Sequence, residues 1–146
     1  MSTKASIFTG VLLVAGLFLS VVWSARAEDN TTSNITTTVD NGGAVYYVGH
    51  TGTNNMLAIS GGGVLTNVAY GYIGASNGAN HNAVTVTGTN SLWSNSGFVS
   101  VGYSGASNTL TIANGGKVCN SNAYIGCYST ASNNTLTVTG SGSVWN

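Results

Sequence analysis

The two histidines of the sequence, His50 and His81, are the first residues to consider for metal binding. His50 follows Gly49 in a predicted turn, and His81 lies in a predicted loop. A zinc site needs three or four converging ligands, whereas these two stand at different positions of the repeat described below. We therefore expect two solvated turn histidines, and neither a metal site nor a cofactor site.

Two cysteines, Cys119 and Cys127, could form a local disulfide if the protein is exported. Strand alternation from Val118 points Cys119 outward, however, and Cys127 falls beyond Gly126. A disulfide tolerates only a narrow range of Cα separations. A bridge and a pair of free thiols both stay open at this point.

Acid–base chemistry is limited by the shortage of charge. Lys117 is the only Lys, Arg, Asp or Glu between Asn41 and Asn146. Glycoside hydrolysis needs paired carboxylates and calcium binding needs clustered acidic residues, so we expect no catalysis by this segment. Nucleic-acid binding needs a basic surface that neutralises phosphates, and this composition excludes such a partner.

Tyrosines supply a candidate binding surface. Tyr47, Tyr72 and Tyr124 share one position of the repeat, and Ser100 interrupts the series. These rings could form an exposed aromatic strip suited to stacking on sugars, or they could pack as cross-strand pairs that stabilise a sheet. We favour packing and keep the strip as the alternative.

A threonine series is predicted to form an outward column at Thr85, Thr111 and Thr137. Regular threonine arrays occur on ice-binding β-helices. Ala58, Ser60 and Ala113 interrupt this one, and we therefore do not expect ice binding.

All of these residues are placed by an internal repeat. An Asn-x-Φ-x-Φ motif, where Φ is Leu, Ile, Val or Met, begins at Asn55, Asn82, Asn108 and Asn134, in steps of 27, 26 and 26 residues. A fixed period between about 20 and 50 residues is the signature of a stacked repeat architecture.

Each repeat contains three apolar landmarks. The first is a short strand whose two apolar residues share one face: Leu57 and Ile59, Val84 and Val86, Leu110 and Ile112, Leu136 and Val138. The second is an apolar residue two positions before Asn: Leu65, Trp93 and Val118, with Val64 as the alternative to Leu65. Trp145 begins a fourth copy of this landmark. The third is a β-branched residue before Gly: Val48, Ile73, Val101 and Ile125.

Three short strands per period of about 26 residues predict an all-β fold, a parallel β-helix solenoid of roughly four coils. We expect right-handed winding, because right-handed parallel crossovers strongly predominate. Helix-forming residues are sparse and no 3.6-residue apolar stripe occurs, which excludes a helical solenoid. An antiparallel sandwich also has short strands, but it does not require one residue type at the same phase of four repeats.

Stacking explains the repeated asparagines. Equivalent side chains of adjacent coils would lie about 4.8 Å apart, so Asn55, Asn82, Asn108 and Asn134 are predicted to form a hydrogen-bonded ladder. A second candidate ladder consists of Asn67, Asn95 and Asn120. The gaps from the landmark glycines to the next strand alternate in length, so the true repeat unit is either one coil or a pair of coils.

The chain divides into three predicted segments. Residues 1–27 are expected to be a cleaved signal peptide, because an apolar run ends in Ala25-Arg26-Ala27. Residues 28–45 are expected to form an N-terminal cap or linker. Val39 to Val45 has the spacing of Ile112 to Val118, which indicates a shortened first coil. Residues 46–146 carry the β-helix repeats and end inside the last one.

The segment from Leu136 to Asn146, together with Tyr124-Ile125-Gly126 and Asn108 to Ile112, resembles the repeat of autotransporter passengers and PEP-CTERM-anchored bacterial surface proteins. The resemblance covers about residues 46–146. It implies export, a β-helical passenger or stalk, and roles in adhesion or biofilms. It also implies a C-terminal translocator or sorting domain, which we expect in the full-length protein beyond Asn146.

The function expected from these features is that of an N-terminal fragment of a secreted or cell-surface adhesin-type structural protein. Its expected partner is a surface ligand, either a carbohydrate or a host or biofilm matrix component. The alternative is a carbohydrate-active β-helix enzyme whose catalytic residues lie beyond Asn146. A free-standing secreted module is a third interpretation, disfavoured because a bare edge coil would invite strand addition.

Overall fold

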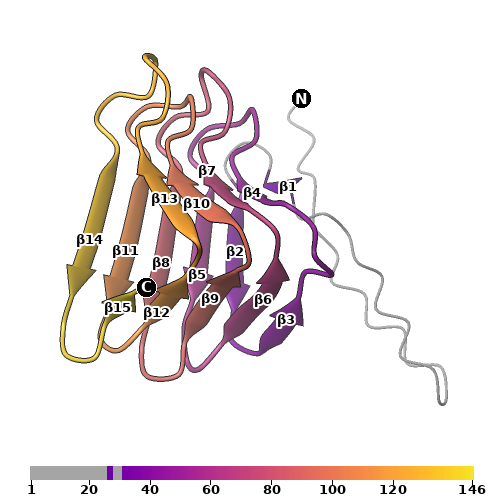
Figure 1. The fold of residues 1–146 in the computed structure, drawn as a ribbon, viewed down its shortest axis with the longest axis vertical. Coiled ribbons are helices and arrows are strands. Elements are labelled where there is room, and N and C mark those ends of the chain that lie inside the picture. Colours follow the sequence, from indigo (N-terminus) through magenta and orange to yellow (C-terminus); the bar gives the residue numbers. More distant parts are fainter. Residues whose placement is uncertain (1–25, 28–30) are drawn as a thin grey trace, which may run out of the picture.

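The computed structural model describes residues 26–27 and 31–146, and these residues form strands and connecting turns (Figure 1). Three parallel five-stranded sheets run along the molecule. Sheet A contains β1 Arg26–Ala27, β4 Tyr46–Val48, β7 Gly71–Ile73, β10 Phe98–Val101 and β13 Asn122–Ile125. Sheet B contains β2 Thr32–Ile35, β5 Met56–Ile59, β8 Ala83–Thr87, β11 Thr109–Ala113 and β14 Thr135–Thr139. Sheet C contains β3 Thr38–Asp40, β6 Val64–Val68, β9 Leu92–Asn95, β12 Lys117–Cys119 and β15 Val144–Trp145.

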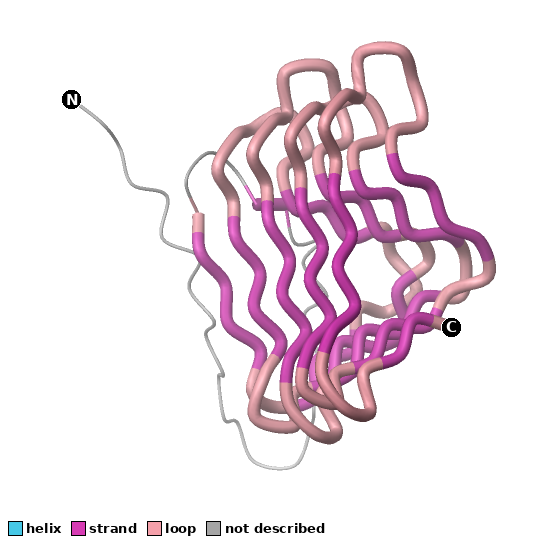
Figure 2. Tube along the Cα trace, turned by 90° about the vertical axis from the view of Figure 1, so that its left-hand side faces the viewer, coloured by secondary structure: helices cyan, strands magenta, loops and turns pink. Residues whose placement is uncertain are grey.

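Every strand pairs with the third strand before or after it in the chain, so three strands make one coil (Figure 2). Leu57 lies opposite Val84, Val84 opposite Leu110, and Leu110 opposite Leu136. The predicted parallel β-solenoid, with about four coils spaced by about 26 residues, is therefore confirmed.

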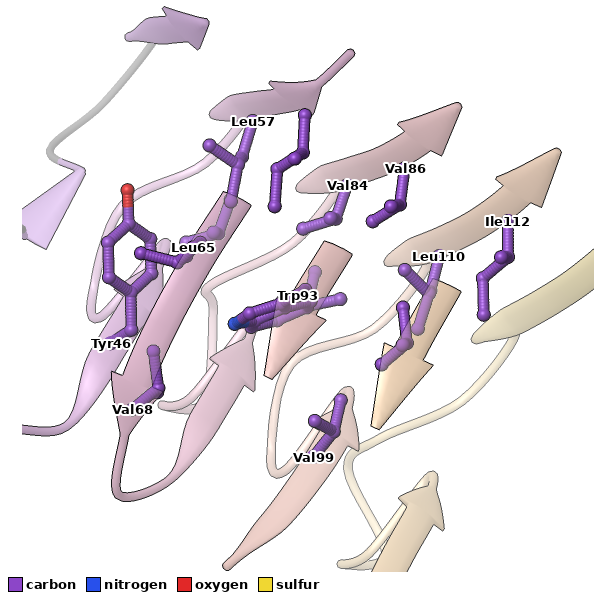
Figure 3. Close-up of a cluster of buried hydrophobic side chains, with 14 of the residues drawn as sticks. Tyr46, Leu57, Leu65, Val68, Val84, Val86, Trp93, Val99, Leu110 and Ile112 are labelled. Atoms are coloured by element: carbon purple, nitrogen blue, oxygen red, sulfur yellow. The ribbon is translucent and has the colours of Figure 1, made fainter. Parts of the chain in front are cut away.

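One core runs inside the three sheets (Figure 3). The predicted apolar columns are buried wherever another coil covers them: Leu57, Ile59, Val84, Val86, Leu110, Ile112, Val48, Ile73, Val101, Trp93 and Val118. Leu65 occupies the second landmark, because it is fully buried and pairs with Trp93, whereas Val64 is only partly buried. Burial of each such side chain contributes roughly 1.5–3 kcal/mol, which offsets the chain entropy that no single coil could offset alone.

The inward columns become exposed at the last described coil. Leu136 and Trp145 are partly buried against the core, but Val138 is 44 % exposed and Ile125 is 49 % exposed. The expectation that every column member is buried is thus wrong for Val138 and Ile125, because no further coil covers them.

Residues 28–45 were expected to be a cap or linker that contains a first coil. Within this range, β2 and β3 pair in register with β5 and β6 and form a coil of the solenoid, which confirms the first coil and excludes a linker over β2 and β3. Val39 pairs with Leu65, so Val39 rather than Val45 takes the second landmark. The coil is shortened between β2 and β3, which two residues separate, whereas four separate β5 from β6. The predicted shortening between the second and third landmarks is absent, because Val48 lies nine positions after Val39 and Ile73 lies eight after Leu65.

The predicted signal peptide lies outside the described residues except for Arg26 and Ala27, whose backbone forms β1 and pairs with Tyr47 and Val48. Cleavage after Ala27 stays a prediction. Within the described ranges, no helix is long and apolar enough to cross a membrane.

Candidate functional site

The predicted Asn ladder is present and runs through the corner between sheets A and B. The side-chain Nδ2 of Asn55 donates to Oδ1 of Asn82 (2.8 Å), Nδ2 of Asn82 donates to Oδ1 of Asn108 (3.0 Å), and Nδ2 of Asn108 donates to Oδ1 of Asn134 (3.1 Å). Each acceptor oxygen also receives the backbone N–H of the preceding ladder residue. Thr31 extends the ladder by donating its hydroxyl to Asn55. The ladder therefore bonds neighbouring coils to each other through buried groups.

Each ladder asparagine follows a residue with left-handed backbone geometry, and three of the four pack against a landmark glycine of the adjacent coil. The residue before each ladder asparagine adopts the left-handed conformation, with φ near +56° at Asn54, His81, Ser107 and Asn133. The landmark glycines leave room for the amides: a Cβ on Gly102 would lie 2.0 Å from Nδ2 of Asn134. The repeated Gly and Asn positions are thus two parts of one packing unit.

The second predicted ladder does not form. Strand β6 has a bulge between Leu65 and Val68, so Val68 rather than Asn67 lies opposite Asn95. Asn67 adopts a φ of +55° and donates to Oδ1 of Asp40 (2.9 Å). Asn95 donates to the carbonyl of Cys119, and Asn120 donates to that of Asn122. The extra residue in β6 breaks the register on which that ladder depended.

The predicted aromatic strip is part of a larger cluster, which we call the aromatic face. It lies on the outer side of sheet A and on the turns before and after its strands, and it comprises His50, Tyr47, Tyr70, Tyr72, Phe98, Tyr103, Tyr124 and Tyr128.

Ring contacts link the aromatic face from coil to coil. The rings of Tyr47 and Tyr72 are stacked, with centroids 5.2 Å apart and planes at 15°. Phe98 and Tyr103 both meet Tyr72 edge to face, at 5.1 and 5.2 Å. Tyr124 then meets Phe98 edge to face at 5.5 Å. The predicted cross-strand packing is therefore confirmed for Tyr47 and Tyr72, and the series continues to Tyr124 through Phe98.

Ser100 does not interrupt the cluster, contrary to the pattern in the sequence. Ser100 pairs with both Tyr72 and Tyr124 and is fully buried. Phe98 precedes it by two residues and Tyr103 follows it by three, and these two rings supply the contacts that a tyrosine at this position would make. Reasoning by repeat phase missed both rings because they come from neighbouring positions.

Exposure divides the aromatic face into inner and outer rings. Tyr47, Tyr72, Phe98 and Tyr103 are partly buried. The outer rings are more open, with Tyr70 at 42 %, Tyr124 at 43 % and Tyr128 at 55 % exposure. Tyr70 packs on Phe98 with a centroid separation of 4.7 Å, and Tyr128 packs on Tyr103 at 4.9 Å. The inner rings thus support outer rings that solvent reaches.

The polar groups of this face are phenol hydroxyls and the imidazole of His50. Strands β4, β7, β10 and β13 contain no Lys, Arg, Asp or Glu. The hydroxyls of Tyr103 and Tyr128 lie 3.3 Å apart, and their hydrogen bond raises the pKa of Tyr103 to about 12. Burial, followed by the neighbouring phenols, raises the pKa of Tyr72. The phenols of Tyr72 and Tyr103 therefore stay neutral across the physiological pH range.

The other predicted candidates are not brought together. Cys119 lies in β12 of sheet C, Cys127 follows β13 of sheet A, and both are free thiols, so the candidate disulfide is absent. His50 packs edge-on against Tyr47 at 4.5 Å and is thus more than a solvated turn residue, whereas His81 is exposed. Within the described part of the chain, no three His, Cys, Asp or Glu side chains cluster as metal ligands would.

The predicted threonine column is in register on sheet B. Thr85 pairs with Thr111, and Thr111 pairs with Thr137. Ala58 extends the column on β5 without a hydroxyl, and Ala113 pairs with both Thr87 and Thr139. Threonine is a favoured strand residue, and this arrangement fits that propensity.

No protein-family model matches the chain, and neither curated proteins nor solved structures give a match. The fold and its side-chain contacts therefore define the class of molecule: a parallel β-solenoid with an internal Asn ladder and an outer aromatic face.

Proposed function

We propose that this chain is part of a secreted or cell-surface β-solenoid of the passenger or adhesin type, a rod that presents a binding surface and performs no catalysis itself. The observation that supports this most directly is the Asn ladder. It bonds Asn55, Asn82, Asn108 and Asn134 in series, so the coils form one continuous rod. The first three amides are buried and that of Asn134 is partly buried. Such a rod repeats the same outer surface at every coil and suits display or spacing.

The few charged groups favour a binding role over an enzymatic one. Asp40 and Lys117 are the charged side chains between residues 31 and 146, and both lie on strands of sheet C. Asp40 already accepts hydrogen bonds from the backbone N–H of Gly42 (2.8 Å) and from Asn67, which lower the pKa of its carboxyl from its ordinary value. A single carboxylate of this kind does not provide the pair that glycoside hydrolysis requires.

Surface display can be tested with an epitope in an open loop. Gly78 lies in the connection between β7 and β8, and a Cβ at this position would meet nothing within 4 Å, so an insertion beside Gly78 should be tolerated. We expect antibody labelling of intact cells of the native host that express the tagged protein. Labelling only after permeabilisation, with an internal marker protein silent on intact cells, would contradict the proposal.

A further inference from the structure

We propose that the aromatic face binds an uncharged polysaccharide whose chain runs along the solenoid axis, with Tyr70, Tyr124 and Tyr128 as the contact residues. This inference rests on the proposed display function and names the ligand class for it. Four strands and their turns contribute to the face, and its rings are linked by contacts across three sheet-A strand pairs, β4 to β7, β7 to β10 and β10 to β13. No other outer surface of the described chain gathers aromatic rings in this way.

Periodicity points to a ligand that is itself a repeating chain. Tyr70 precedes Gly71, and the Gly71–Val99 pair places it beside Phe98 on the next coil. Phe98 in turn contacts Tyr124 one coil further on. The centroid separations along this line, 4.7 and 5.5 Å, follow the strand spacing of about 4.8 Å. A linear polysaccharide presents one similar ring after another, and a row of aromatic rings can follow it.

Polarity points to sugars among repeating chains. A pyranose ring combines an apolar C–H face with hydroxyl groups, and tyrosine combines an apolar ring with one hydroxyl donor and acceptor. The exposed rings Tyr70, Tyr124 and Tyr128 offer both kinds of contact. They are held in place by Phe98 and Tyr103, so little side-chain entropy is lost on binding.

Charge excludes the other common partners of aromatic rows. Single-stranded nucleic acids stack on aromatic rings, but their binding sites also carry basic side chains along the backbone path. Strands β4, β7, β10 and β13 carry no basic or acidic residue. The aromatic face contains the imidazole of His50 but no Lys or Arg, so an acidic polysaccharide would meet no permanent counter-charge there. The ligand class that remains is a neutral polysaccharide.

The test is a binding assay with the purified full chain. Insoluble cellulose, chitin and neutral xylan serve as probes in depletion assays, and soluble neutral glucans serve in calorimetry. A polyuronate and single-stranded DNA are the charged comparisons. We expect saturable binding to at least one neutral polymer, and this binding should be insensitive to salt because no ion pairs form.

Substitution locates the binding surface. Tyr124→Ala should weaken binding at least about tenfold. The double variant Tyr70→Ala/Tyr128→Ala should weaken binding by more than the single variant does. Thr111→Ala on sheet B is the matched control and should bind like the parent chain. Each variant is first compared with the parent chain by circular dichroism and thermal unfolding. Tyr124→Phe keeps the aromatic ring and should retain most of the affinity, and it replaces Tyr124→Ala in the comparison if the alanine variant does not fold.

Four outcomes would overturn the inference. Three concern the polymers: no neutral polymer retained, equal affinity in the parent and the tyrosine variants, or binding only to charged polymers that declines with salt. The fourth is a protein partner captured on this face without any polysaccharide binding. The binding assay uses purified protein and the display assay uses intact cells. A failure to detect surface display would therefore refute the proposed function without changing the measured affinity for polysaccharide.

Discussion

Asn82 and Asn108 share one oxygen atom in two hydrogen bonds. Oδ1 of Asn108 accepts the side-chain Nδ2 of Asn82 at 3.0 Å and the backbone N–H of Asn82 at 2.9 Å. Both asparagines are fully buried. An amide oxygen with two acceptor positions is well suited to this role, and the donor end of the same amide is left free to bond the next coil. Asn recurs at every coil because its amide oxygen accepts from one neighbouring coil while its amide nitrogen donates to the other.

Replacing a ladder residue should therefore cost more than one ordinary hydrogen bond. Asn108→Ala removes the acceptor and leaves two buried donors of Asn82 without it, so we expect a loss of about 2–4 kcal/mol in the free energy of unfolding. Chemical denaturation measures this loss. The control is Asn77→Ala at an exposed loop position, which should change stability by less than about 0.5 kcal/mol. Equal effects of the two substitutions would refute the role of the ladder.

Glycine substitutions separate backbone strain from steric conflict. Gly102 and Gly78 both have positive φ, +73° and +87°, so alanine is strained at each. Only at Gly102 would the new Cβ meet a neighbour, Nδ2 of Asn134 at 2.0 Å, whereas Gly78 faces open space. We expect Gly78→Ala to cost about 1 kcal/mol and Gly102→Ala to cost at least about 3 kcal/mol, as measured by denaturation. Similar costs at both sites would show that the amide does not pack against Gly102.

Four residues precede the ladder asparagines in a left-handed backbone conformation, and Ser107 is the residue type among them that tolerates this conformation least. Its φ is +56°, and the equivalent positions are held by Asn54, His81 and Asn133, whose residue types tolerate this conformation better. Ser107→Asn should therefore raise stability by about 0.5–1 kcal/mol, seen as a higher Tm. Ser104→Asn, at a position without positive φ, should give no such gain. A fall in Tm for Ser107→Asn would contradict the strain argument.

Trp93 has a buried indole N–H without a partner among the described protein groups. Trp145, two coils later, donates its indole N–H to Asn120, but Val68 occupies the corresponding place beside Trp93. Trp93→Phe removes the unpaired donor, which offsets part of the lost packing, so we expect a cost within about 1 kcal/mol. Trp93→Ala should cost about 3–5 kcal/mol. If both variants lose the same stability in urea, the indole N–H carries no penalty.

The Tyr103 hydroxyl should resist ionisation. Its hydrogen bond with Tyr128 favours the neutral phenol and raises the pKa of Tyr103 from 10.0 to about 12. A raised folded-state pKa stabilises the fold below pH 10.0, and this contribution is lost as pH rises towards 12. Tyr128→Phe should lower the pKa of Tyr103, measured by NMR titration of its ring carbons. Tyr46→Phe, which removes a buried core tyrosine, should leave it unchanged; an unchanged pKa in Tyr128→Phe would contradict the assignment.

The sequence was informative wherever one residue type recurs at one phase. The columns through Leu110 and Ile112 and the ladder through Asn108 were predictable, because stacking converts sequence period directly into spatial contact. The contacts also support a pair of coils as the repeat unit. Asn82 and Asn134, which follow the two longer connections, additionally donate to the carbonyls of Gly52 and Gly105.

Features that depend on local irregularity could not be predicted this way. The bulge in β6 adds one residue that no period reveals, and it removed the second ladder by placing Val68 opposite Asn95. The aromatic face was underestimated because Phe98 and Tyr103 fill the gap at Ser100 from other phases. A search for aromatic residues within a few positions of each Tyr72-like site would have found both rings.

Disulfide trapping between adjacent coils tests the register of the solenoid most directly. In a background with Cys119 and Cys127 replaced by serine, Thr85→Cys with Thr111→Cys places two thiols on directly paired residues of β8 and β11. Neighbouring strands lie about 4.8 Å apart, within reach of a disulfide, whereas two coils separate Thr85 from Thr137 by about twice that distance. We predict rapid intramolecular oxidation of the Thr85/Thr111 pair and none of the Thr85/Thr137 pair, read by mass spectrometry. Oxidation of the second pair but not the first would contradict the stacked coils on which the ladder and the aromatic face depend.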